Sequence, residues 1–138
     1  MRRLLVDTGP LVAIVSRADQ HHATCVMTLR HLPGPLFSCW AVITEAAWLL
    51  RGHPRAIQQL LGSLDGGFLK LLSLTGSEGV AIAEVMKRYA DIRPQVSDAA
   101  LVYLAEREGI DTIFTLEQRD FSVYRLGRRR PFRILPEL

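Results

Sequence analysis

The stretch Leu4-Leu5-Val6-Asp7-Thr8-Gly9-Pro10 decides the fold of this chain. Three apolar residues end on a carboxylate, turn-forming residues follow, and a second apolar run begins at Leu11. Such a pattern predicts a buried strand that leads into a helix. Ligands of open α/β sheets bind at the carboxyl ends of the strands, so we expect Asp7 at the rim of a binding site. A buried carboxylate there needs a cation, a donor or a charged partner to offset its lost hydration.

The bulk composition is typical of one soluble globular domain, which we take to be residues 1–138. A hydrophobic fraction of 49% and a charged fraction of 22% exclude a disordered chain. No apolar segment approaches the ~20 residues that span a bilayer, and Asp7 and Pro10 interrupt the apolar run that could imitate a signal peptide. Cys25 and Cys39 lack metal-ligand spacing and are compatible with reduced thiols. We therefore expect a cytoplasmic protein with no membrane partner.

Apolar segments and turn residues alternate along the chain in a pattern that predicts strands separated by helices. Ser97 or Asp98 is the expected N-cap of the last long helix. This order predicts the α/β class, with a mainly parallel central sheet of about four to five strands flanked by helices. The expected strands cover residues of about 3–7, 36–39, 68–72, 112–115 and 132–135, and the expected helices about 10–17, 20–31, 41–51, 54–64, 75–90 and 97–108.

Acidic residues fall where the predicted strands end or the helices begin. Strand ends and helix starts occupy the same edge of a parallel α/β sheet, so these acids can converge although they are far apart in sequence. Packed without cations they would repel one another, and Mg²⁺ or Mn²⁺, which prefer oxygen ligands, would relieve that repulsion. Such ions also activate water for attack on a phosphodiester. The residues are Asp7, Glu45, Asp98, Glu117 and Asp120. For a single aspartate beside a strand, a capping or turn-forming role is the alternative, and for Glu45 the alternative is a surface position.

A block of arginines near the C-terminus contains no acidic residue: Arg125, Arg128, Arg129, Arg130 and Arg133. Without these five, the remaining basic residues number 12 against 14 acidic ones, so the net charge of +3 is a local feature. One interpretation is a patch that faces the phosphates of RNA. A solvated tail explains the block equally well.

Aromatic and histidine residues add little to the predicted site. Trp40 and Trp48 flank the predicted helix 41–51 and are assigned to the core rather than to stacking an RNA base. The four histidines lack the spacing of a zinc site and are assigned to the surface or to helix ends.

Four segments resemble the PIN-domain family, and specifically the VapC-like toxins of type II toxin–antitoxin pairs. They are Leu5-Val6-Asp7-Thr8-Gly9-Pro10-Leu11-Val12-Ala13, Thr44-Glu45-Ala46, Ser97-Asp98-Ala99-Ala100-Leu101-Val102 and Phe114-Thr115-Leu116-Glu117-Gln118-Arg119-Asp120-Phe121. The resemblance covers nearly the whole chain. It implies a PIN domain that acts as a metal-dependent endoribonuclease on an RNA substrate, with Mg²⁺ or Mn²⁺ as cofactor. It also implies a cognate antitoxin that silences the enzyme, and a homodimer.

Position by position, the resemblance implies that Asp7, Glu45 and Asp98 bind the metal. Thr8 matches the small polar neighbour that supports the first aspartate or its water, and Thr115 is a further supporting residue.

Two positions depart from the family pattern. Glu117 stands where the last motif usually has Asp, and its carboxylate would have to fold back to reach the same ion. Asp120 keeps the family's following acid and can compensate. Gln95 stands where related sequences often place Asp, and it can hydrogen-bond a metal-bound water but brings no charge. Glu117 and Asp120 therefore remain alternatives for the fourth acid.

Two other functions are compatible with the sequence. One is a catalytically weakened PIN module that binds RNA or a protein partner without cleavage. The other is a phosphoryl-accepting receiver with Asp7 as acceptor, which ranks well behind because neither Lys70 nor Lys87 follows a strand near the acids.

Overall fold

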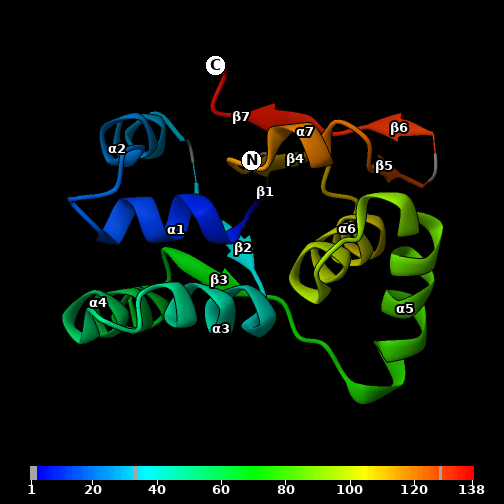
Figure 1. Cartoon of the computed structure of the whole chain (residues 1–138), viewed down its shortest axis with the longest axis horizontal. Coiled ribbons are helices and arrows are strands. Elements are labelled where there is room, and N and C mark those ends of the chain that lie inside the picture. The colour runs from blue at the N-terminus through cyan, green and yellow to red at the C-terminus, as the bar shows by residue number, and fades with distance from the viewer. Residues whose placement is uncertain (1–2, 33, 128) are drawn as a thin grey trace.

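Five parallel strands form the central sheet of the protein in the order β3-β2-β1-β4-β7 (Figure 1). The structure is a computed structural model and describes residues 3–32, 34–127 and 129–138. Because the strands are parallel, their carboxyl ends lie along one edge of the sheet. The strands are β1 (Leu4–Val6), β2 (Leu36–Ser38), β3 (Leu69–Leu71), β4 (Thr112–Phe114) and β7 (Arg133–Leu135).

Helices connect and flank these strands, and α5 and α6 pack against each other as a pair (Figure 1). No helix within the described ranges has the length and apolar character needed to cross a membrane. The α-helices are α1 (Thr8–Val15), α2 (His22–Arg30), α3 (Trp40–Leu49), α4 (Pro54–Asp65), α5 (Gly79–Arg88), α6 (Val96–Glu108) and α7 (Gln118–Phe121). Two 3-10 helices, η1 (Gly76–Glu78) and η2 (Ala90–Ile92), flank α5, and β5 (Arg125–Leu126) pairs with β6 (Arg130–Pro131) in a separate antiparallel hairpin.

The core is centred on β1, β4 and α6. Leu5, Val6, Ile113 and Phe114 of the two strands are each 0% exposed. Helix α6 is buried on most of its surface between Ser97 and Ala105 rather than along one stripe, as expected for a helix enclosed by other elements. The acids that follow β1 and begin α6 are therefore attached to the most deeply buried part of the fold.

The predicted fold class is confirmed, and each of the five predicted strands is present in the central sheet. Three local predictions are wrong. The expected helix 75–90 is divided into η1, α5 and the start of η2. The N-cap of α6 is Gln95, not Ser97 or Asp98, because the Asp98 carboxylate folds back to accept a hydrogen bond from the Gln95 amide at 3.3 Å. Helix α7 and the β5–β6 hairpin were not predicted at all.

The assignment of the tryptophans to the core is also wrong. Trp40 and Trp48 are 59% and 64% exposed, and the Arg51 guanidinium lies over the Trp48 ring at 4.1 Å from its centroid. The buried face of α3 is instead formed by Val42, Ile43 and Ala46. The histidines lie at helix ends as predicted, at the start and end of α2 and before α4.

Candidate active site

A pocket of about 260 Å³ opens at the carboxyl edge of the sheet, where the loops after β1 and β4 meet α3 and the start of α6. All five predicted acids line it. The complete lining is Asp7, Thr8, Gly9, Glu45, Leu49, Arg93, Gln95, Asp98, Glu117 and Asp120. Neither of the chain's two lysines is among these described residues, which removes the support for a phosphoryl-accepting receiver.

Asp7 follows β1 directly and is only 2% exposed. It occupies the N-cap position of α1, yet its side chain makes no capping hydrogen bond, so the alternative role as a helix cap does not apply. The Thr115 hydroxyl donates a hydrogen bond to Asp7 Oδ2 at 2.8 Å. The other oxygen, Oδ1, is buried and has no hydrogen-bond partner among the described residues. A buried oxygen without a donor is costly, and this one needs a ligand.

Glu45 is half-buried on α3, and its carboxylate is held from two sides. The hydroxyls of Thr8 and Ser97 both donate to Glu45 Oε1, each at 2.7 Å. These bonds join α1, α3 and α6 at one point of the pocket. They leave Oε2 without a hydrogen bond from the described residues.

Asp98 is the third residue of α6 and is 8% exposed. Its Oδ2 accepts the hydrogen bond from the Gln95 amide. Asp7, Glu45 and Asp98 thus share one arrangement, in which a donor of the chain holds one carboxylate oxygen and the other oxygen remains available to a ligand.

The electrostatic state of these acids follows from burial without a positive partner. Burial raises the pKa of Asp7 to about 6, and the charges of Glu45 and Glu117 add to the rise, while the nearby Thr8 amide and the Thr115 hydroxyl oppose it. Burial, followed by the charge of Asp7, raises the pKa of Asp98 to about 7. None of the pocket acids takes part in an ion pair within the described ranges. The pocket therefore concentrates negative charge that the chain does not neutralise.

The loop after β4 brings the remaining acids to the pocket. The Thr115 hydroxyl, which donates to Asp7, also accepts a hydrogen bond from the Glu117 amide at 2.9 Å. Gly9 allows the close approach of this loop, because a Cβ added there would lie 3.3 Å from the Leu116 side chain. Glu117 is exposed at the rim, and Asp120 is half-buried on α7.

Two residues of the site were missed by sequence reasoning. Ser97 supports Glu45 in the same way as Thr8, and its position beside Asp98, like that of Thr8 beside Asp7, is the signal that could have identified it. Arg93 lines the pocket from the turn after η2, and no local pattern in the sequence indicates this.

The described members of the C-terminal arginine block are not part of the lining of the acidic pocket. Arg125 donates hydrogen bonds to backbone carbonyls, including that of Ser122, and Arg130 pairs with Asp111 at 2.9 Å. Arg129 is exposed, and Arg128 lies outside the described residues. None of the described members of the block lines the acidic pocket, so a role in binding RNA remains a prediction.

The donor set fits a hard divalent cation such as Mg²⁺ or Mn²⁺, because it offers only oxygen atoms and includes the unpartnered Oδ1 of Asp7. Within residues 3–32, 34–127 and 129–138, no three acidic, histidine or cysteine side chains are grouped closely enough to hold an ion by themselves. A magnesium ion in this pocket would therefore keep several water ligands, which is its usual behaviour in proteins.

Comparison with known proteins identifies the family. The sequence profile described as "PIN domain" matches residues 4–126. The chain is 30% identical over 136 residues to ribonuclease VapC26 of Mycobacterium tuberculosis (strain ATCC 25618 / H37Rv), an alignment that covers 96% of this chain and 100% of that protein. The crystal structure of the sarcin–ricin loop cleaving toxin VapC20 of Mycobacterium tuberculosis has the same fold, with a TM-score of 0.74 at 18% identity over 80% of this chain and 86% of that one. The protein therefore belongs to the PIN-domain family, among its VapC-like members.

Proposed function

We propose that the protein is a metal-dependent endoribonuclease, the toxin of a type II toxin–antitoxin pair, that hydrolyses RNA phosphodiester bonds with Mg²⁺ or Mn²⁺. The observation that carries the proposal is the buried Oδ1 of Asp7, which has no donor and belongs to a pocket of five acids without an ion-pair partner in the described chain. The names of two similar proteins, a ribonuclease and a toxin that cleaves the sarcin–ricin loop, support RNA as the substrate class.

Asp7, Glu45 and Asp98 are the proposed metal-binding acids, each with an oxygen that no chain donor occupies, and water ligands of the ion would complete their contacts with it. Glu117 is the preferred fourth acid over Asp120, because its charge is among those that raise the pKa of both Asp7 and Asp98.

When bound, a divalent ion would supply the positive charge that activates water and stabilises the charge developing on the phosphate. In the reaction, a water oxygen bonds to phosphorus and the water gives up one proton, while the bond from phosphorus to the leaving ribose oxygen breaks and that oxygen takes up one proton, so the step is balanced. The chain's own contribution is preorganisation: Thr115 holds Asp7, and Thr8 and Ser97 hold Glu45, so these carboxylates need not reorient as charge develops.

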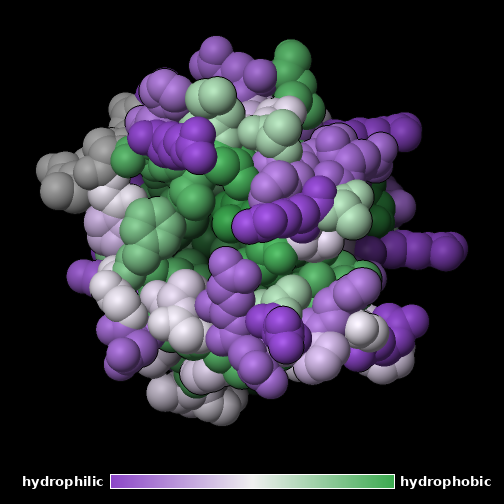
Figure 2. Space-filling model, turned by 90° about the vertical axis from the view of Figure 1, so that its left-hand side faces the viewer, coloured by the Kyte–Doolittle hydropathy of each residue, from purple (hydrophilic) through white to green (hydrophobic). Residues whose placement is uncertain are grey.

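An apolar hollow of about 110 Å³ between α1, α2 and α4 supports the proposed antitoxin partner. Its lining includes Leu11, Ile14, Leu29 and Leu60. Figure 2 shows this face of the molecule, on which hydrophobic surface gathers around a central depression. An amphipathic segment of an antitoxin would place its apolar side in such a groove. The exposed tryptophans of α3 provide apolar surface for the proposed homodimer. A cytoplasmic location is part of the same proposal, because a toxin that acts on cellular RNA has its substrate there.

The test of enzymatic function is a cleavage assay with antitoxin-free protein and labelled cellular RNA. We expect cleavage with Mg²⁺ or Mn²⁺, none with EDTA, and none from Asp98→Asn protein that unfolds as cooperatively as the wild type. Wild-type protein that neither cleaves RNA with either ion nor binds the ions would refute the proposal. RNA binding without metal-stimulated hydrolysis, even after Glu117→Asp, would instead identify a non-cleaving PIN module.

The antitoxin groove is tested with two adjacent exposed glutamines of α4. Gln59 lines the hollow and Gln58 does not, so Gln59→Trp should obstruct the groove while Gln58→Trp serves as the matched control. Co-purification with the proposed cognate antitoxin should be lost only in Gln59→Trp protein, and cleavage by the free toxin should be unaffected in both. Equal capture by both variants would exclude this groove as the binding surface.

A further inference from the structure

Arg93 is the single positively charged residue among the described residues that line the acidic pocket. Its side chain is exposed and belongs to no ion pair and no cation–π contact in the described chain. Arg3, Arg88, Arg107 and Arg130, in contrast, each pair with an acid. A guanidinium placed beside several acids, yet paired with none of them, is available to an external anion.

The backbone holds Arg93 in an unusual conformation. With φ 50° and ψ 62° it follows η2 in the left-handed region, and it is the only non-glycine residue with positive φ in the described ranges. The turn is anchored on both sides, because Ile92 is half-buried and Pro94 is buried. Glycine would adopt this conformation with less strain, so an arginine at this position is consistent with a role for its side chain.

We propose that Arg93 binds a phosphate group of the RNA at the mouth of the acidic pocket. The identity of the substrate rests on the proposed ribonuclease function. The pocket acids can hold a cation but would repel the RNA backbone, so a phosphate that enters needs a positive contact from the chain. Arginine presents a planar fork of N–H donors that matches two phosphate oxygens, and these charge-assisted hydrogen bonds are among the strongest that side chains form.

The proposal is tested by RNA affinity, with Arg93→Gln compared with Arg17→Gln. Arg17 is also exposed and also forms no ion pair with a described residue, but it does not line the pocket, which makes it a matched control. Both changes are made in Asp7→Asn protein so that the RNA stays intact. Binding of a fluorescein-labelled single-stranded RNA of about 20 nucleotides is followed by anisotropy between about 50 and 200 mM KCl.

We expect Arg93→Gln to weaken binding about tenfold, since a charge-assisted bidentate contact is lost. The slope of log affinity against log salt should fall by about 0.7, the contribution of one phosphate contact on a single strand. Arg93→Lys should keep the slope but recover only part of the affinity, because lysine lacks the planar fork. Arg17→Gln should change neither quantity.

Unchanged affinity and slope in Arg93→Gln, or an equal loss in Arg17→Gln, would overturn the proposal. Arg93→Gly separates binding from a backbone role: glycine adopts the left-handed conformation without strain and keeps the turn, yet this change should weaken RNA binding as much as Arg93→Gln. A lower melting temperature with unchanged RNA binding would contradict the proposal. If wild-type protein cleaves no RNA but Arg93→Gln still selectively weakens binding, the ribonuclease function fails and the assignment of Arg93 stands.

Discussion

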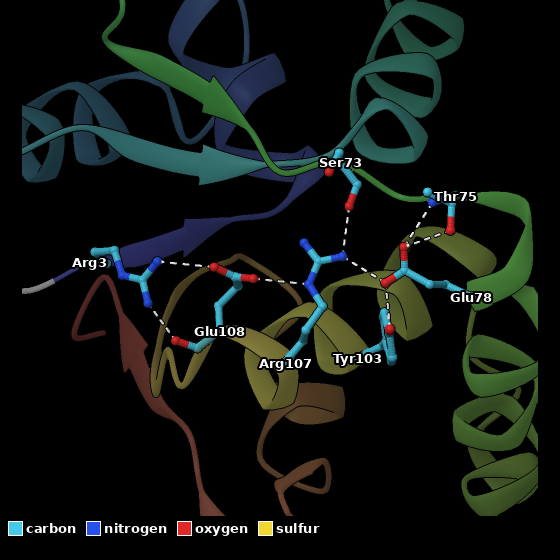
Figure 3. A network of polar contacts seen from close by, with 7 residues as sticks. All are labelled: Arg3, Ser73, Thr75, Glu78, Tyr103, Arg107 and Glu108. Atoms are coloured by element: carbon cyan, nitrogen blue, oxygen red, sulfur yellow. Dashed lines mark hydrogen bonds and ion pairs between the residues drawn. The ribbon is translucent and has the colours of Figure 1, made fainter.

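Two groups of acids in this protein have opposite electrostatic surroundings. In the pocket, Asp7 and Asp98 lie among further acids and take part in no ion pair within the described ranges. At the other group, which we term the Arg107 network, Arg107 contacts Glu78 at 2.7 Å and Glu108 at 3.0 Å (Figure 3). The Arg107 network comprises Arg3, Ser73, Thr75, Glu78, Tyr103, Arg107 and Glu108.

The pKa values of the two groups move in opposite directions. Hydrogen bonds from the Tyr103 hydroxyl, the Thr75 amide and Arg107 lower the pKa of Glu78 to about 2. Arg107 and Arg3 likewise hold the pKa of Glu108 below its ordinary value. Asp7 and Asp98 have pKa values raised to about 6 and about 7.

This difference separates acids that serve the fold from acids that serve a ligand. The Arg107 network ties the start of β1 and the segment before η1 to α6, and the chain supplies its own cations. The pocket acids repel one another when ionised and therefore oppose folding at neutral pH. A cluster of acids that opposes folding and forms no ion pair within the described ranges is best explained by an external cation, as the proposed function requires.

The largest expected difference between the two groups is in catalysis. Asp7→Asn should lower the rate of RNA cleavage by about a hundred- to a thousandfold, because it removes a proposed metal ligand. Glu108→Gln, which changes an acid of the Arg107 network in the same way, should leave cleavage unchanged. Single-turnover assays at saturating Mn²⁺ measure both rates, and similar losses in the two variants would break the comparison.

The effects on stability should have opposite signs when metal is absent. The rise in the pKa of Asp7 from 3.8 to about 6 corresponds to about 3 kcal/mol, so Asp7→Asn should stabilise the protein by up to that amount at about pH 8. Arg107→Gln should instead destabilise it by about 1 kcal/mol, the scale of a partly exposed ion pair. Urea unfolding in EDTA provides the measurement. Destabilisation by Asp7→Asn would show that its carboxylate is needed by the fold.

The dependence of stability on pH should distinguish the pocket acids from the acids of the Arg107 network. The folded protein binds protons at Asp7 and Asp98 more tightly than the unfolded chain does. The protonated groups therefore add to the free energy of unfolding in full below about pH 4, and this stabilisation is lost as pH rises through about 6 and about 7. Glu78 has a lowered pKa, and its contribution is lost only as pH falls below about 4.5 toward 2. The free energy of unfolding of metal-free protein should therefore decline between about pH 4 and 7, and the decline should be smaller in Asp7→Asn protein. An equal decline in both proteins would show that Asp7 is not responsible.

The smallest expected effect distinguishes the two candidates for the fourth acid. Glu117→Gln should lower cleavage by about tenfold, in the range found for residues that support a metal site from its periphery. Asp120→Asn should have a smaller effect, because the Glu117 amide donates to the same Thr115 hydroxyl that holds Asp7, whereas Asp120 has no such link to Asp7 within the described ranges. The ratio of the two rate constants decides the assignment, and a larger loss in Asp120→Asn would reverse it.

The parts of the molecule that were predictable from sequence depend on local patterns. The apolar run before Asp7 and the polar residues after it identify β1 and its end. Similar apolar runs bounded by turn-forming residues identify the other strands of the sheet. Because the strands are parallel, the position of the acids at one edge of the sheet can then be predicted from topology alone, before any side-chain contact is known.

The remaining features depend on contacts that no local pattern encodes. The pairing of Arg3 with Glu108 joins residues separated by 105 positions, so the sequence could not show which acids are neutralised. Arg93 reaches the pocket through a left-handed turn, which is rarely expected at an arginine. The exposure of Trp40 and Trp48 depends on which face of α3 packs inward. Their hydrophobic side chains were the reason for the wrong prediction that they belong to the core.

The most direct test of the account is calorimetric titration of Mn²⁺ into antitoxin-free, metal-free protein at about pH 7, where Asp98 is partly protonated. The wild type and Glu108→Gln should both bind the ion and release protons to the buffer, while Asp7→Asn should lose both signals. Absence of binding to the wild type at millimolar Mn²⁺, or equal binding by Asp7→Asn, would contradict the claim that the pocket is built for a divalent cation.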